Sequence, residues 1–161
     1  MLSGWHVSHL PVLLADKLQK WQVIDEVVVS WEELKIEGFL LMPRPFHVPF
    51  VSSKAGFRLS GMGLVLPNTK EVSRMGRSWR KRMVKQQRAW KGCTILDEGS
   101  RPLGRLQDVL FDERTLRVTH LVASRGMVGD LLWGSLVIAR DDILKLTPSV
   151  IKIRTGRAPF L

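Results

Sequence analysis

The sequence predicts a mainly β protein in which a basic helical linker joins two small antiparallel β-barrels. Three observations lead to this fold class: short apolar runs alternate with turn residues, two stretches of the chain resemble each other, and the basic residues gather between those stretches. A length of 161 residues allows two small domains. We expect a divergent first domain at 1–73, the linker at 74–91 and the second domain at 92–161.

The second half of the chain shows the strand pattern most clearly. β-prone runs at 109–111 and 116–123 are separated by polar, turn-like residues. Another turn is expected at 97–100, between two strands, and later strands at 136–139 and 150–154. Five or six short strands within about 65 residues favour a small antiparallel barrel or a strongly bent sheet.

An internal repeat extends this interpretation to the first half. Residues 24–41 align without a gap to residues 106–123, and the side chains agree in character along the alignment. Leu34, for example, falls opposite Leu116. Both stretches have the pattern of a strand, a polar turn and a second strand.

A second block supports the same repeat, because residues 64–66 match residues 136–138 in the same chain order. The first copy departs from the second in two places. It inserts a proline-containing loop at 43–56, and it has Gln22 where the second copy has Gly104. The first half is therefore expected to be the more divergent copy.

Most of the net charge lies in one short segment. The chain has 25 Lys and Arg against 15 Asp and Glu, a formal charge of +10. Residues 70–91 hold nine bases and one acid, a net +8, so the rest of the chain is close to neutral. Such a concentration of positive charge suits phosphates, an anionic membrane surface or an acidic protein face.

The basic segment has the pattern of a helix. Ser78 is a candidate N-cap, and Gly92 stands where a helix would stop. Apolar or neutral side chains recur at helical spacing along it: Trp79, Met83, Gln86 and Trp90. They make one partly apolar stripe, and we expect the bases to occupy the other faces of the helix.

Two sets of side chains in and near this segment are candidate binding residues. Eight bases could contact an anion or an anionic partner: Arg74, Arg77, Arg80, Lys81, Arg82, Lys85, Arg88 and Lys91. Three tryptophans could make apolar contacts with a partner: Trp79, Trp90 and Trp133. The competing interpretations are a solvated helix whose tryptophans dock on neighbouring domains, and a flexible linker without a binding role.

The second half resembles a PRC-barrel domain from residue 92 to about residue 154. The resemblance rests on Gly92-Cys93-Thr94-Ile95-Leu96-Asp97, Gly99, Pro102-Leu103-Gly104-Arg105-Leu106-Gln107-Asp108-Val109, Leu110-Phe111-Asp112, Thr115-Leu116-Arg117-Val118, Leu136-Val137-Ile138 and Ile143. The PRC-barrel family includes the cytoplasmic domain of the photosynthetic reaction-centre H subunit and the C-terminal half of a bacterial ribosome-maturation factor. Through the repeat, the first half would be a second PRC-type barrel.

The resemblance implies a binding or adaptor module that works through surface contacts. Such modules contact proteins, RNA-containing particles or membrane complexes, and fold analogy alone does not choose among these partners. The first half does not look like the other domain of the ribosome-maturation factor, so that protein's function does not transfer as a whole.

The sequence shows no pattern of catalytic residues, so we expect no enzyme activity, no metal and no cofactor. His6 and His9 are three residues apart, but no acidic or cysteine ligand stands near them. Cys93, the one cysteine, is expected to be a small core residue in a strand. The glycines form neither a nucleotide-binding nor a dinucleotide-binding fingerprint.

The segment 126–129, Gly-Met-Val-Gly, is interpreted as a flexible hairpin tip. Leu131, Leu132 and Trp133 follow it closely. The favoured expectation is that these apolar residues pack inside the second barrel. The alternative is an exposed apolar patch that binds a partner.

The chain is expected to be cytoplasmic, with a peripheral position on a membrane left open. No base precedes the apolar residues at the N-terminus, and no stretch reaches the roughly 20 apolar residues that span a bilayer. The leading hypothesis for function is a non-catalytic adaptor or assembly module that binds a protein or a macromolecular complex. The alternatives are an RNA- or ribosome-associated maturation factor that binds phosphates, and attachment to an anionic membrane; the oligomeric state stays open.

Overall fold

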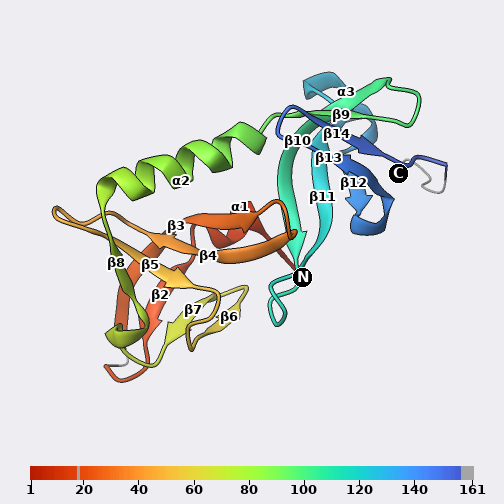
Figure 1. Ribbon diagram of the computed structural model, residues 1–161. Helices are drawn as coiled ribbons and strands as arrows, with labels where there is room; N and C mark the ends of the chain where they lie inside the picture. The colour runs from red at the N-terminus through yellow and green to blue at the C-terminus, as the bar shows by residue number, and fades with distance from the viewer. Residues whose placement is uncertain (18, 157–161) are drawn as a thin grey trace. The chain divides into compact units, whose positions relative to one another are not determined.

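The computed structural model describes residues 1–17 and 19–156, and it shows a mainly β protein with 47% of residues in strands and 20% in helices (Figure 1). These residues form two compact units. Unit 1 contains the described residues of Met1–Val84 together with Phe111–Arg117. Unit 2 contains Lys85–Leu110 together with the described residues from Val118 onward. The boundary falls inside the longest helix, α2 (Arg77–Trp90).

Unit 1 is built on one mixed β-sheet. Its elements are β1 (Leu2–Ser3), α1 (Gly4–Val7), β2 (Pro11–Leu14), β3 (Gln19–Ser30), β4 (Lys35–Leu41), β5 (Val48–Ser52), β6 (Arg58–Ser60), β7 (Gly63–Leu66), the 3-10 helix η1 (Thr69–Glu71) and β8 (Ser73–Met75). The strand order is β6-β7-β2-β3-β4-β5-β8, and β2 runs parallel to β7 while the other pairs are antiparallel.

Unit 2 has a second mixed sheet. Its elements are β9 (Thr94–Leu96), β10 (Pro102–Phe111), β11 (Val118–Ser124), α3 (Met127–Trp133), β12 (Leu136–Ala139), the 3-10 helix η2 (Arg140–Asp142), β13 (Ile143–Leu146) and β14 (Val150–Ile153). The order is β12-β11-β10-β9-β14-β13, with β9 parallel to β14. The buried apolar side chains of this unit are Cys93, Ile95, Leu106, Val109, Val118, Leu121, Ala123, Leu136, Ile138, Ile151 and Ile153.

The two sheets share one strand order, which gives the internal repeat a structural counterpart. Strands β6-β7-β2-β3-β4-β5 of unit 1 correspond in turn to β13-β14-β9-β10-β11-β12 of unit 2, and a parallel pair falls at the same place in both. The first aligned block is confirmed at the level of backbone conformation. Leu34 and Leu116, which the alignment pairs, both have positive φ angles, 50° and 62°, and both side chains are buried.

The second aligned block is wrong. Residues 64–66 form β7, whose counterpart is β14, whereas residues 136–138 lie in β12, whose counterpart is β5. Short runs of Leu, Val and Ile look alike in any buried strand, so their sequence does not say which neighbour each strand pairs with. Equivalent strands are identified by the neighbours to which they are hydrogen-bonded. By that criterion β7 is equivalent to β14, whereas the sequence match joins it to β12.

The expectation of purely antiparallel sheets is also wrong. Each sheet contains a parallel pair, and over the described residues neither strand path closes on itself, because no ladder joins its outermost strands. Unit 1 does carry a seventh strand on its path, β8 (Ser73–Met75), which pairs with β5 and includes the first two residues of the predicted linker, 74 and 75.

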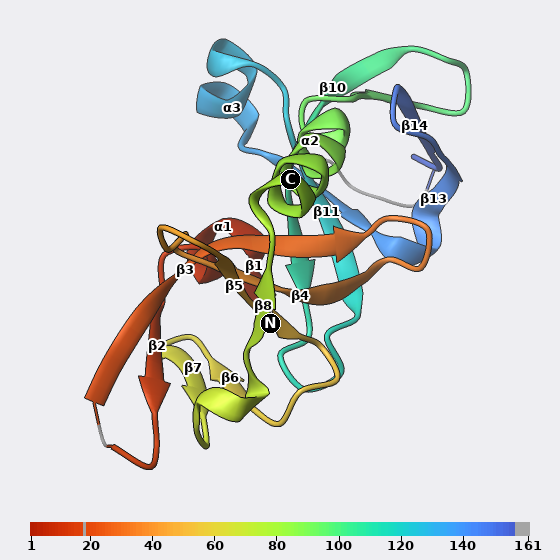
Figure 2. The same cartoon turned by 60° about the vertical axis from the view of Figure 1, so that its left-hand side comes forward.

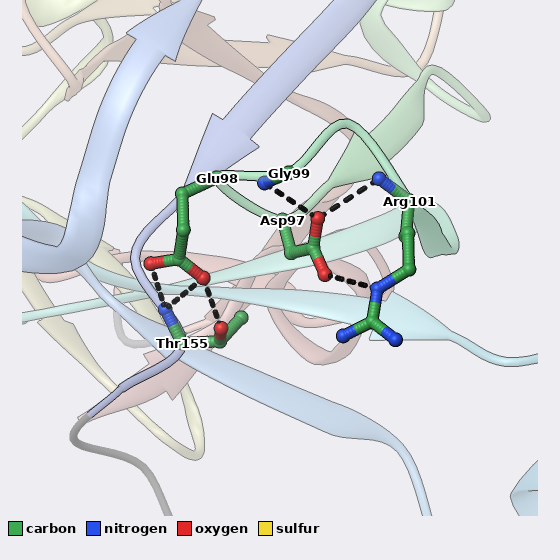
Figure 3. A network of polar contacts seen from close by, with 5 residues as sticks. All are labelled: Asp97, Glu98, Gly99, Arg101 and Thr155. Carbon is green, nitrogen blue, oxygen red and sulfur yellow. Dashed lines mark hydrogen bonds and ion pairs between the residues drawn. The ribbon is translucent and has the colours of Figure 1, made fainter.

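The turn between β9 and β10 confirms the one predicted at residues 97–100, and two carboxylates hold it (Figure 3). Asp97 Oδ1 accepts hydrogen bonds from the backbone N–H groups of Gly99 and Arg101 at 2.9 and 2.8 Å, and its Oδ2 accepts one from Arg101 Nε at 3.0 Å. Glu98 accepts hydrogen bonds from the backbone N–H and the hydroxyl of Thr155. These bonds tie the turn to the residues that follow β14.

We expect Asp97→Asn to lower the melting temperature at neutral pH and to matter less in acid. Hydrogen bonds from Arg101 hold the pKa of Asp97 below its ordinary value, and those from Thr155 do the same for Glu98. A carboxyl with a depressed pKa in the folded state stabilises the fold above its unfolded pKa of about 4, and that stabilisation disappears as the pH falls through the folded pKa.

Melting curves followed by circular dichroism between acid and neutral pH measure this effect, with Asp141→Asn on the exposed Asp141 as the matched control. The gap between wild type and Asp97→Asn should begin to narrow as the pH falls to about 4 and close once the pH is below the folded pKa of Asp97. A gap of the same size at every pH would mean that the carboxylate charge has no part in holding the turn.

Candidate functional site

Helix α2 carries the basic residues and ends where the sequence predicts. Gly92, two residues after the helix, has a φ of +80°, the left-handed conformation that glycine adopts at helix C-termini. The predicted N-cap at Ser78 is wrong, because the helix begins one residue earlier, at Arg77. The chain enters the helix at Gly76, whose carbonyl accepts the hydrogen bond of the Arg80 N–H at 3.1 Å.

One face of α2 is seated on the sheet of unit 1. Val84 is 7% exposed and joins a buried cluster with Val28 of β3, Leu40 of β4 and Val48 of β5. Partly buried side chains cover this cluster: Phe50, Trp79 and Met83. The Trp79 and Phe50 rings meet edge to face at a centroid distance of 5.1 Å. The first turns of α2 are therefore anchored by apolar packing.

The predicted apolar stripe is right for Trp79 and Met83 and wrong for Gln86, which is exposed. Val84, and not Gln86, lies on the side of α2 that packs against the sheet of unit 1, and Gln87 is half-buried. The partly covered face is thus rotated from the predicted one. The sequence gives no sign of this rotation, since the same spacing fits either choice of neighbour.

Two of the basic side chains have partners within unit 1. Arg80 Nη2 lies 2.7 Å from Asp25 Oδ2, and these side chains are 31% and 25% exposed. Arg77 is exposed, and its Nη2 donates a hydrogen bond to the Pro45 carbonyl at 2.8 Å. The ion pair of Arg80 thereby adds to the apolar packing of Trp79, Met83 and Val84 on the sheet, and we call this set of contacts the seat of the helix.

The other candidate bases are exposed to solvent. On α2 these are Lys81, Arg82, Lys85 and Arg88. Arg74 lies on β8, and Lys91 directly follows α2. Among residues 1–17 and 19–156, no carboxylate forms an ion pair with any of these six bases.

Four bases share one face of α2, and we call them the basic stripe: Arg77, Lys81, Lys85 and Arg88. They follow each other at steps of four, four and three residues, the spacing that places side chains above one another on a helix. The stripe runs about 16 Å along the helix axis. Arg82 lies further round the exposed side.

The basic stripe opposes the stability of its own helix. Each like-charge pair at these spacings costs about 0.2–0.5 kcal/mol, so the three successive pairs of the stripe cost about 1 kcal/mol. The first turn of α2 also contains no acidic residue to complement the positive end of the helix dipole. A helix that only joined two units would not need this arrangement.

We expect Lys85→Glu to stabilise the protein by about 1 kcal/mol, because it turns repulsive pairs with Lys81, Arg82 and Arg88 into attractive ones. Urea unfolding followed by circular dichroism measures the change. Gln86→Glu is the control, since it adds the same charge with one basic neighbour at helical spacing, Arg82. If Lys85→Glu destabilised the fold, Lys85 would have a stabilising role in the folded protein that its exposure does not suggest.

The segment predicted as a hairpin tip is the helix α3, between Gly126 with φ +90° and Gly134 with φ +73°. The expectation that its apolar side chains pack inside the unit is wrong, because all of them are exposed. The exposed fractions are Met127 91%, Val128 70%, Leu131 85%, Leu132 62% and Trp133 62%. In Figure 2, α3 lies at the upper left, on the far side of unit 2 from β13 and β14, in keeping with its place between β11 and β12.

Contacts with the residues just before α3 fix the position of this helix. Asp130 accepts hydrogen bonds from the Arg125 backbone N–H at 2.7 Å and from the Ser124 hydroxyl at 2.5 Å, and the bond from Ser124 is the main cause that lowers the pKa of Asp130. A Cβ atom at Gly129 would lie 2.7 Å from Arg125 Cβ, so glycine allows the helix to sit close to that residue. The one charged side chain of α3 is thus directed at its own loop.

The outer side of α3 is consequently aliphatic. Four side chains at positions i, i+1, i+4 and i+5 form what we call the apolar face: Met127, Val128, Leu131 and Leu132. None of them carries a nitrogen or an oxygen atom. Of the three predicted tryptophan contacts, Trp133 is exposed beside this face, whereas Trp79 and Trp90 are partly buried.

The remaining residues considered from the sequence have structural contacts. Cys93 is buried, and burial raises the pKa of its thiol. His6 Nε2 lies 3.0 Å from the Gly61 carbonyl, and His9 Nδ1 lies 2.9 Å from the Trp5 carbonyl. Both rings therefore bond to backbone.

Neither a protein-family model nor a curated protein matches the chain. Within the part of the chain that the structure describes, no helix is both long enough and apolar enough to cross a membrane.

Proposed function

We propose that this protein is a non-catalytic adaptor that attaches to an anionic macromolecular surface through α2. The observation that carries the proposal is the basic stripe, in which four exposed bases face one direction without a carboxylate partner on the described chain. These like charges repel one another within α2, and a partner of opposite charge would relieve that repulsion.

The length of the stripe favours an extended partner over a small anion. Two neighbouring bases, about 6 Å apart along the axis, are enough to hold one phosphate or carboxylate. A row of about 16 Å instead matches a surface with repeated negative charges. An acidic face of a protein complex, a phosphate backbone and an anionic membrane all have this property.

We also propose that the two units are two copies of a PRC-type module, as the resemblance of the second half implies. The shared strand order of the two sheets and the matching conformations of Leu34 and Leu116 support a common design. In this proposal the sheets are the scaffold, and α2 and α3 are the elements that contact partners.

RNA is a second candidate partner, because most lysine and arginine side chains of α2 form no ion pair with a carboxylate of the described residues. Such binding would use phosphates and would lack base stacking on α2, because Trp79 packs on Phe50 and Trp90 is partly buried. We therefore expect it to show little sequence preference.

Retention on heparin, a generic polyanion, tests the adaptor proposal. The stripe variant replaces Arg77, Lys81, Lys85 and Arg88 by glutamine. The matched control replaces four exposed bases elsewhere, Lys20, Lys54, Arg105 and Lys145, by glutamine, so both variants lose the same charge. We expect the stripe variant to elute at clearly lower salt than the control. Equal elution of the two variants would show that only net charge matters, and the proposal would be wrong.

A further inference from the structure

We infer that the apolar face of α3 inserts into the interface of an anionic lipid bilayer, so that the anionic surface bound by this protein is a membrane. The inference rests on the proposed function of the basic stripe and names its partner. It is carried by a separate observation in unit 2: four neighbouring aliphatic side chains that are 62–91% exposed on one short helix.

The construction of α3 suits the interface of a bilayer. The N–H groups of Asp130 and Gly134 donate hydrogen bonds to the Gly126 and Asp130 carbonyls, each at 2.9 Å, and a helix that lies in the interface keeps the groups of its end turns at the hydrated headgroup level. Asp130 directs its carboxylate at Ser124 and Arg125, so the apolar face presents no charge. Contiguous exposed apolar side chains on a soluble surface mark an interaction site.

The composition of the face argues for lipid over a protein groove. The apolar face consists of Met127, Val128, Leu131 and Leu132, with no hydrogen-bonding side chain to fix an orientation. Lipid chains impose no such geometric requirement.

Charge complementarity selects an anionic membrane and disfavours a second copy of the chain. Two copies would each bring a formal charge of +10, and their mutual repulsion opposes association. Anionic headgroups instead attract the stripe. A single apolar anchor gives marginal and reversible membrane binding, and stable attachment takes two signals, such as an apolar anchor and a polybasic patch. The chain has both.

Trp133 adds a feature typical of membrane interfaces. It ends α3 beside the apolar face, its side chain is 62% exposed, and tryptophan is enriched at the level of lipid headgroups. Insertion of α3 would move this indole from water to the headgroup region. The resulting blue shift of fluorescence should be absent from Trp133→Phe.

The test is co-sedimentation of the full chain with vesicles of phosphatidylcholine, alone or mixed with phosphatidylglycerol. The α3 variant Leu131→Gln/Leu132→Gln keeps good helix formers and leaves the stripe intact. Its matched control, Val137→Thr/Leu144→Thr, removes two exposed apolar side chains elsewhere in unit 2. Circular dichroism verifies that each variant is folded.

We expect wild type and control to bind the mixed vesicles and not pure phosphatidylcholine. The α3 variant should bind about 100-fold more weakly, because each leucine lost from the lipid phase costs a factor of about 10 or more. The inference is overturned if wild type ignores mixed vesicles, or if the α3 variant binds them as wild type does.

The outcomes separate this inference from the proposed function. If the α3 variant binds mixed vesicles like wild type and the stripe variant alone fails, the adaptor proposal stands and insertion of α3 is wrong. If the stripe variant keeps full binding to heparin and vesicles, the adaptor proposal itself is wrong. Binding to RNA in preference to mixed vesicles would replace the membrane by a phosphate backbone.

Discussion

Gly38→Ala is expected to destabilise unit 1 by about 3 kcal/mol, the largest effect of any single substitution considered for this protein. Gly38 is buried in β4, and a Cβ atom there would lie 2.5 Å from the Val51 carbonyl oxygen and 2.3 Å from Phe50 Cζ. The carbonyl belongs to β5, the adjacent strand, so relief requires β5 to move away from β4. Overpacking against backbone is costly because close-packed interiors cannot absorb the volume.

The same substitution should disturb the seat of α2. Phe50 packs edge to face on Trp79, and both cover the cluster that holds Val84. Urea unfolding measures the stability change, and Gly61→Ala is the control, because its Cβ would meet only Leu2 Cδ2 at an ordinary 3.7 Å. Wild-type stability of Gly38→Ala would mean that β5 can move away from β4 at little cost.

The stripe variant is expected to bind heparin about 100-fold more weakly than wild type at low salt. Each exposed ion pair contributes up to about 1 kcal/mol, and four contacts of about 0.7 kcal/mol give a factor of about 100. The structure predicts this loss without a loss of fold, because the four side chains are exposed and the apolar packing of α2 on unit 1 is formed by other residues. The variant gives up one exposed hydrogen bond, from Arg77 to the Pro45 carbonyl.

Stability of the stripe variant should be unchanged or slightly higher, since it removes the like-charge pairs of α2. Calorimetric titration gives the affinity, and urea unfolding gives the stability. The control with Lys20, Lys54, Arg105 and Lys145 replaced should lose much less affinity. A stripe variant that bound as wild type and unfolded earlier would assign these bases a structural role.

The sequence predicts those features of the fold that depend on local pattern. The hairpins of the first aligned block, the turn at Asp97 and the end of α2 at Gly92 are all determined by side chains near one another in the chain. The pairing of β7 with β2 and of β14 with β9 is not, because parallel partners come from distant segments with similar apolar composition.

The candidate site shows the same limit. The helical spacing of the bases is visible in the sequence, but the pairing of Arg80 with Asp25 joins residues 55 positions apart and leaves no local signal. The exposure of α3 is missed for a related reason. A run of Met, Val and Leu usually indicates a core, and only the contacts of Asp130 and Gly129 with the preceding loop show which side of the helix faces the unit.

The affinity for heparin as a function of salt tests whether the basic stripe binds an anionic surface through its charges. At low salt, wild type should bind about 100-fold more tightly than the stripe variant. The gap should close as the salt approaches about 1 M, where the screening length falls to about 3 Å. Equal affinities at low salt would show that the stripe does not bind the polyanion. A gap that persists at high salt would contradict binding by charge, because screened charges could not maintain it.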